Sequence, residues 1–168
     1  EPKNNFLKKI QNLAKKKNIV LIFDECSSGF RETFGGIYKK YKLDPDMVIF
    51  GKALGNGYAI TSVLGKKNIM ENAEKTFISS TFWTERIGPS AALKTLEIME
   101  REKSWEKITK IGKDIKTKWQ TLADSLNLKI IHTGIPALAG FRFEYENNMA
   151  YKTLITQEML KRGFLADN

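Results

Sequence analysis

A continuous apolar run at Ile19–Phe23 constrains the fold of this chain more than any other feature of the sequence. Short runs of β-branched and aromatic residues, without polar alternation, are typical of strands buried on both faces in parallel sheets that helices cover. The run stops abruptly at Asp24-Glu25. A second run, Met47–Phe50, follows an Asp-Pro-Asp turn and leads into Gly51-Lys52. The two runs predict neighbouring strands of an α/β fold.

The rest of the chain combines helical periodicity with shorter strand patterns. Apolar residues recur at the three- and four-residue spacing of amphipathic helices, and Gly163 is a helix stop signal. We expect helices over about 5–17, from 88 to about 100, and over 105–126 and 151–162, with strands over 60–64, 76–80, 128–132 and 138–143.

The character of these patterns changes near residue 100, which predicts two parts. Residues 1–100 are expected to belong to a large α/β domain, and residues 101–168 to comprise a connecting helix and part of a smaller α/β domain. The chain opens inside a helical pattern and closes just after Gly-Phe-Leu-Ala-Asp-Asn. We therefore expect it to be a fragment of a longer protein, and a fragment of this kind could be inactive by itself.

The composition is that of a globular protein, with 42% hydrophobic and 28% charged residues. No apolar run approaches the length that spans a membrane, and the first residues lack the apolar stretch of a signal peptide. The single cysteine, Cys26, excludes an internal disulfide framework. These features predict no membrane association and a cytoplasmic location.

The formal charge of +9 raises the alternative of a basic nucleic-acid-binding module. The basic residues are spread thinly, however, in short clusters at Lys8–Lys9, Lys15–Lys17 and Lys39–Lys40. No nucleic-acid-binding motif accompanies them, and aromatic residues are not interleaved with them. We expect solvated helix faces and no nucleic-acid partner; strongly salt-dependent retention on DNA or RNA would favour the alternative.

Two side chains of opposite charge follow the two predicted strands. Asp24 comes after the first strand and Lys52 after the second. In open α/β sheets, ligands bind beyond the carboxyl ends of the strands. A carboxylate and an amine in this position suit pyridoxal 5'-phosphate (PLP) chemistry, in which an amine attacks an aldehyde and a carboxylate keeps a pyridine nitrogen protonated. Taken alone, an Asp at a strand end is more often a turn former, and a Lys after a strand is more often a surface residue. The neighbouring sequence therefore decides whether Asp24 and Lys52 are catalytic.

Those surroundings resemble three consecutive signatures of the class III aminotransferase family. The first is the Asp-Glu-x-x-x-Gly motif, in the segment FDECSSGFRETFGG that contains Asp24. The second is the lysine motif, in PDMVIFGKALGNGYAITSVLG, which contains Lys52. The third is a Ser-Thr-aromatic segment, in FISSTFWTERIGPSAAL, which contains Ser80 and Thr81. The three lie in the family's order and spacing and cover most of residues 20–96.

The resemblance implies the PLP-dependent transferase fold type I, like that of aspartate aminotransferase, with part of the large domain and part of the C-terminal small domain. It implies that Lys52 forms the Schiff base with PLP and that Asp24 holds the pyridine nitrogen. Thr81, with Ser80 beside it, would reach the cofactor phosphate of the neighbouring subunit, so that a homodimer shares its active sites. The implied substrates are a small-molecule amino donor and a carbonyl acceptor.

Several departures from the family pattern bear on the reaction. Many members carry a Gln near the cofactor's phenolic oxygen, at the position of Ser27. Residues Gly29–Arg31 resemble the glutamate-1-semialdehyde aminomutase branch, whereas Gly55–Ala59 and Thr81–Arg86 differ from it. The expected function is therefore an aminotransferase of unassigned substrate. The aminomutase and a non-catalytic protein with the PLP fold are the alternatives.

Other chemistry-bearing residues have simpler interpretations. Cys26 has no histidine near it in sequence and is expected to be a buried structural cysteine. His132, the only histidine, lies in an alternating strand pattern and is expected to be structural. No further carboxylate or histidine joins Asp24 and Glu25 to complete a metal shell, so we expect no metal.

Overall fold

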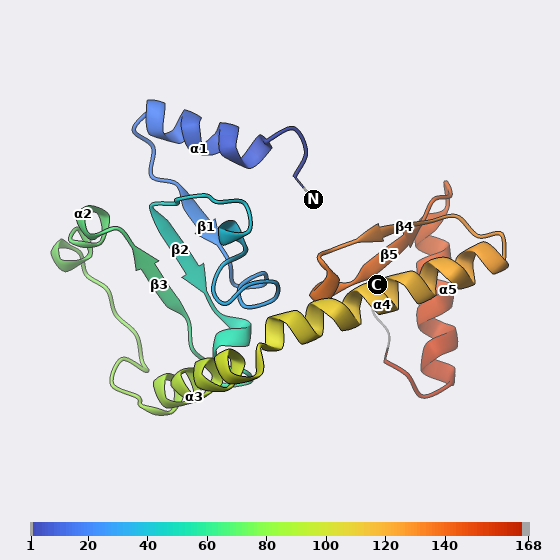
Figure 1. Ribbon diagram of the computed structural model, residues 1–168. Helices are drawn as coiled ribbons and strands as arrows, with labels where there is room; N and C mark the ends of the chain where they lie inside the picture. Colours follow the sequence, from blue (N-terminus) through green and yellow to red (C-terminus); the bar gives the residue numbers. More distant parts are fainter. Residues whose placement is uncertain (1, 166–168) are drawn as a thin grey trace. The chain divides into compact units, whose positions relative to one another are not determined.

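The computed structural model describes residues 2–165. The chain divides into two compact units, residues 1–106 and 107–168, each with its own sheet (Figure 1). That these units are parts of a large and a small domain stays a prediction. Among the described residues, no helix combines the length and the hydrophobicity needed to cross a membrane.

The first unit contains a three-stranded sheet in the order β1-β2-β3. Its helices and strands, in chain order, are α1 (Phe6–Lys16), β1 (Ile22–Asp24), β2 (Met47–Phe50), β3 (Ser62–Gly65), α2 (Lys67–Met70) and α3 (Ile87–Glu102). Three 3-10 turns lie between them: η1 (Ile37–Lys39), η2 (Lys52–Leu54) and η3 (Ala73–Lys75).

Strand direction decides which residues meet at the edge of this sheet. β1 runs parallel to β2, with Asp24 in register with Ile49. The carboxyl ends of both strands therefore lie at the same edge, as the two apolar runs predict. β3 then returns antiparallel to β2, with Ser62 opposite Phe50. The sheet is thus mixed, and its parallel pair carries the candidate site residues.

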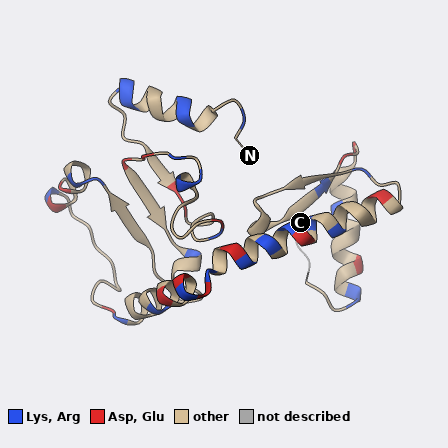
Figure 2. Cartoon of the chain, viewed as in Figure 1, with Lys and Arg blue, Asp and Glu red and all other residues tan. Residues whose placement is uncertain are grey.

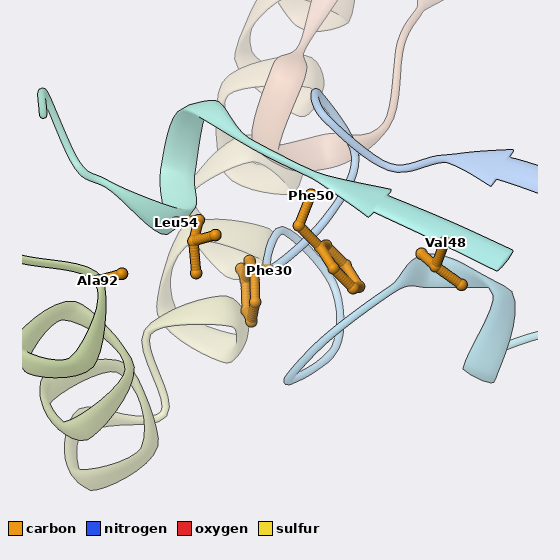
Figure 3. Close-up of a cluster of buried hydrophobic side chains, with 5 residues drawn as sticks. All are labelled: Phe30, Val48, Phe50, Leu54 and Ala92. Atoms are coloured by element: carbon orange, nitrogen blue, oxygen red, sulfur yellow. The ribbon is translucent and has the colours of Figure 1, made fainter. Parts of the chain in front are cut away.

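A small cluster of buried side chains lies beneath this edge. Phe50 of β2 packs against Phe30, with ring centroids 5.2 Å apart, and Leu54 of η2 and Ala92 of α3 belong to the same cluster (Figure 3). Gly88 allows the start of α3 to come close, because a Cβ there would lie 3.1 Å from the Ala59 carbonyl oxygen. The cluster therefore joins the turn that begins at Lys52 to a helix far along the chain.

The second unit is built on a hairpin. α4 (Ser104–Ser125) begins at the end of the first unit, and β4 (Ile130–Thr133), η4 (Pro136–Leu138), β5 (Gly140–Phe143) and α5 (Asn148–Lys161) follow. β4 and β5 pair antiparallel. Phe143, a buried residue of β5, lies in a chain of aromatic rings that runs from Trp119 to Tyr151.

Two strand predictions differ from the structure. Only the end of the apolar run Ile19–Phe23 is strand, and Ile19 and Val20 are 59% and 44% exposed. No described element of the first unit covers those two side chains, so burial does not hold Ile19 and Val20 in a strand conformation. Residues 76–80, which are expected to form a strand, form none. An extended sequence pattern needs a hydrogen-bonding neighbour to become a strand, and this segment pairs with none of the three strands.

Candidate active site

The two charged residues singled out in the sequence lie at the common edge of the parallel pair. Asp24 is the last residue of β1, and Lys52 lies two residues beyond the end of β2, where it begins η2. Lys52 has a φ of 44°, a left-handed conformation that costs a residue with a side chain about 1–2 kcal/mol. Strain of this kind persists where the surrounding structure imposes it, and it clusters at functional sites.

Asp24 is held in its charged form by its own turn. Its Oδ1 accepts a hydrogen bond of 2.9 Å from the backbone N–H of Cys26. This bond, and next the Cys26 thiol, keep the pKa of the Asp24 carboxyl below its ordinary value, and the charge of Lys52 acts in the same direction. The carboxylate and the Lys52 amine are therefore near enough to affect each other, as the resemblance requires.

A buried carboxylate fixes the turn that carries these groups. Glu25 is only 2% exposed. Its Oε2 accepts a hydrogen bond of 2.5 Å from the Ser28 hydroxyl, and its Oε1 accepts one of 3.1 Å from the Tyr38 N–H. A buried polar group needs such partners, because water no longer solvates it. The pairing ties the turn after β1 to η1 and so fixes the backbone beside Asp24.

The amine of Lys52 reaches across to the same turn. Its Nζ donates a hydrogen bond to the Ser27 hydroxyl oxygen. The backbone on either side is closely packed, since a Cβ at Gly51 would lie 3.3 Å from the Cys26 sulfur. Ser27, which departs from the family's Gln, therefore lies beside the amine rather than away from the site.

A cavity of about 840 Å³ opens beside Lys52. Eleven residues line it, and among them are Ser80, Phe82, Trp83 and Glu85 from the segment before α3. The sequence motifs therefore converge in space as well as in order: the lysine and the Ser-Thr-aromatic segment border one hollow. Its size lies in the range usual for small-molecule sites in proteins.

The remaining predicted site residues do not line this cavity. Asp24 borders a smaller hollow of about 220 Å³, together with Phe23 and Tyr38. Thr81 is exposed, and the neighbouring Ser80 hydroxyl accepts a hydrogen bond of 3.2 Å from the Phe82 N–H. Within this chain the structure thus brings Lys52 together with Asp24 on one side and with Ser80 on the other.

The alternative candidates have structural surroundings. Cys26 is half-buried beside Asp24. His132 belongs to the second unit, where its Nε2 lies 3.1 Å from the Gln120 Oε1. In the part of the chain that the structure describes, no group of three His, Cys, Asp or Glu side chains is placed to hold a metal ion.

Sequence reasoning missed three residues of this region. The burial of Glu25 has no periodic signal, because it depends on Ser28 and Tyr38 folding back over it. The contact of Ser27 with Lys52 joins positions 25 residues apart. Glu85 has a local signal, a carboxylate just before a helix, although its place in the cavity follows only from the fold.

The residues present fit a PLP group. An amine that can anchor an aldehyde, a carboxylate held ionised beside it and a hydroxyl across a cavity are the three kinds of contact that such a cofactor needs. The observation that carries this fit is the parallel pairing of β1 with β2, because it places Asp24 and Lys52 at the same edge of the sheet.

Comparisons with known proteins identify the family of the chain. The family model described as aminotransferase class-III matches residues 1–166. The 3-aminobutyryl-CoA aminotransferase of Cloacimonas acidaminovorans is 36% identical over 157 residues, which cover 93% of this chain and 38% of that protein. The glutamate-1-semialdehyde 2,1-aminomutase of Neisseria meningitidis is 30% identical over 145 residues, covering 84% of this chain and 34% of that protein.

The fold agrees as well. The Sphingopyxis sp. MTA144 FumI protein, solved in its PLP internal aldimine form, superposes with a TM-score of 0.90 at 21% identity, covering 96% of this chain and 39% of that one. The fold is therefore that of the PLP-dependent aminotransferases. The chain spans less than two fifths of the length of each of these three proteins. By its match to the family model, the chain belongs to the class III aminotransferase family, whose cofactor is PLP.

Proposed function

We propose that the protein is a PLP-dependent aminotransferase in which Lys52 anchors the cofactor and Asp24 faces its pyridine nitrogen. The observation that carries this proposal is the meeting of the two charged residues at one edge of the β1-β2 pair, beside a cavity that Ser80 also lines. The family membership supports the same reading.

Each residue has a definite task in this proposal. Bound PLP supplies a ring that accepts electrons from the carbon next to the substrate's amino group. Asp24 holds the proton on the ring nitrogen, and the hydrogen bonds that keep its carboxyl ionised serve that task. The Lys52 amine would take a proton from the substrate carbon as general base and, as general acid, would deliver it to the cofactor carbon that bears the nitrogen. Thr81, with Ser80 beside it, binds the phosphate of the partner subunit's cofactor through neutral hydroxyl groups.

The test is borohydride reduction after incubation with PLP, followed by peptide mapping of the protein expressed from its complete reading frame. We expect a pyridoxyl adduct on Lys52 and none in the Lys52→Ala variant. Lys67 is an exposed lysine of the same unit, so Lys67→Ala is the matched control and should leave the adduct unchanged. Adducts scattered over surface lysines in the unsubstituted protein would contradict the proposal.

A second candidate is the aminomutase reaction, which the relatives that are about 30% identical support. The two reactions differ in how many substrates they need. An aminotransferase requires a separate carbonyl acceptor for sustained turnover, whereas an aminomutase rearranges one molecule that carries both groups. Sustained turnover of glutamate 1-semialdehyde without an added acceptor would favour the aminomutase.

The proposal includes a homodimer, in which Thr81 acts on the partner subunit's cofactor, and a cytoplasmic location. The exposure of Phe82 and Trp83, 71% and 66%, is consistent with a partner covering this segment. A non-catalytic protein with the same fold is disfavoured by the combination of Asp24, Lys52 and Ser80.

A further inference from the structure

The cavity beside Lys52 contains one negative charge. Among the described residues that line it, Lys52 and Glu85 are the charged ones, and the others are small, aromatic or aliphatic. In the proposed function, Lys52 anchors the cofactor and its amine is not available to pair with a substrate anion. Glu85 is then the charge that this chain presents to whatever else occupies the cavity.

Glu85 is fixed in place by the start of α3. One carboxylate oxygen accepts a hydrogen bond from the Ile87 N–H, and the other accepts one of 3.1 Å from the Gly88 N–H. The positive end of a helix favours a carboxylate there. These free N–H groups would otherwise attract an anionic substrate group, but Glu85 already occupies them.

The side chain keeps the capacity to act on a substrate. A carboxylate offers about four lone-pair positions, of which these two bonds use two. No lysine or arginine among the described residues forms an ion pair with Glu85. A carboxylate brought into the cavity would therefore meet a like charge, whereas a neutral N–H donor could bond to the free lone pairs.

The rest of the lining suits an uncharged group. Tyr58, Phe82 and Trp83 border the cavity and are 59%, 71% and 66% exposed. Aromatic faces pack well against amide, acyl and alkyl groups. The name of the relative that is 36% identical, 3-aminobutyryl-CoA aminotransferase, describes a compound whose carboxyl is masked as a thioester.

We infer that Glu85 is a specificity-determining residue, and that it favours amines whose acyl group is uncharged, as in an amide or a thioester, over the corresponding free carboxylates. The inference rests on the proposed function, since it assigns the substrate class of the Lys52 cavity.

The test compares two substrates of closely matched shape in two proteins that differ in one side chain of closely matched shape. The substrates are 3-aminobutanamide and 3-aminobutanoate, and the variant is Glu85→Gln, in the PLP-loaded protein expressed from its complete reading frame. We expect the unsubstituted protein to have the higher kcat/KM for the amide. In Glu85→Gln, the amide-to-carboxylate ratio of kcat/KM should fall about fivefold, the scale of an interaction between partly exposed charges. Because both substrates meet the same preparation, this ratio does not depend on the folded fraction.

Glu100→Gln is the control, because it removes the same charge from an exposed position of α3 that does not line the cavity. The amide-to-carboxylate ratio of kcat/KM in Glu100→Gln should stay within about twofold of the ratio in the unsubstituted protein, since a screened surface charge contributes little. An unchanged ratio in Glu85→Gln, an equal fall in Glu100→Gln, or a preference of the unsubstituted protein for the carboxylate would each overturn the inference.

A binding measurement separates this inference from the proposed function. Butanamide and butanoate lack an amino group and cannot react, so calorimetry reports their affinity for the cavity alone. If neither amine is turned over and Lys52 forms no adduct, the proposed function fails. A preference for butanamide over butanoate that is lost in Glu85→Gln would still support the role of Glu85. If the ratio of the two affinities is the same in the unsubstituted protein and in Glu85→Gln, the inference about Glu85 is overturned.

Discussion

Asp24, Cys26 and Lys52 influence one another through charge. The Cys26 thiol donates a hydrogen bond to the Asp24 carboxylate, and the charge of Lys52 acts on both groups. That bond, then burial and the negative charge of Asp24, raise the pKa of the Cys26 thiol, while Lys52 lowers it. A cysteine expected to be merely structural is therefore a reporter of both site residues.

This arrangement predicts opposite effects of two substitutions on Cys26 alkylation. At pH 8, Asp24→Asn should speed the reaction with iodoacetamide several-fold, because the thiolate is the nucleophile and its pKa falls when the negative charge is lost. Lys52→Ala should slow the reaction, because a positive charge is lost. In the unsubstituted protein, the rate should still rise beyond pH 9. Mass spectrometry of the Cys26 peptide measures all three rates, and equal rates in the two variants would contradict the electrostatic account.

At the scale of elements, close approaches decide which positions tolerate a side chain. In the second unit, α4 passes so near η4 that a Cβ at Gly112 would lie 1.8 Å from the Pro136 carbonyl oxygen. An alanine in a helix interior ordinarily stabilises it by about 1 kcal/mol relative to glycine. Here the overlap is with backbone, which cannot rotate away, so the clash outweighs the gain in helix propensity.

We therefore expect Gly112→Ala to lower the free energy of unfolding by about 1–3 kcal/mol, the usual cost of overpacking. Urea denaturation followed by circular dichroism measures the change. Lys113→Ala is the control, because it is an exposed neighbour on α4 and should have almost no effect. A Gly112→Ala protein as stable as the control would mean that α4 and η4 can move apart at little cost.

At the scale of the whole molecule, the distribution of charge and the exposure of Thr81 bear on possible partners. Basic residues lie on α1 and along α4, where acidic residues are interspersed with them (Figure 2). On α4, the basic residues that contribute to the charge of +9 therefore share the helix surface with acidic ones. The assembly prediction depends on Thr81, which is exposed and lies outside the Lys52 cavity of its own chain.

Co-expression of two inactive variants tests whether active sites are shared. If Thr81 serves the partner subunit, a mixed dimer of Lys52→Ala and Thr81→Ala contains one intact site and one doubly defective site. We expect such a dimer, isolated with two affinity tags, to recover about half of the unsubstituted activity, since independent sites add. If Thr81 serves its own subunit, each site keeps one defect, and activity should not exceed the mean of the two homodimers.

The sequence by itself determined the family, the fold class and the two helices that cross residues 87–125, because motif order and helical periodicity are local properties. The residues of β2 were also predictable, since a short apolar run between turn signals has few alternatives. Tertiary structure alone decided that Glu25 is buried, that Ser27 meets Lys52 and that Glu85 faces the cavity. The burial of Glu25 depends on Ser28 and Tyr38 folding back over it. Ser27 meets Lys52 because β1 pairs in parallel with β2, and Glu85 meets the cavity because α3 packs on η2; no local pattern encodes these tertiary contacts.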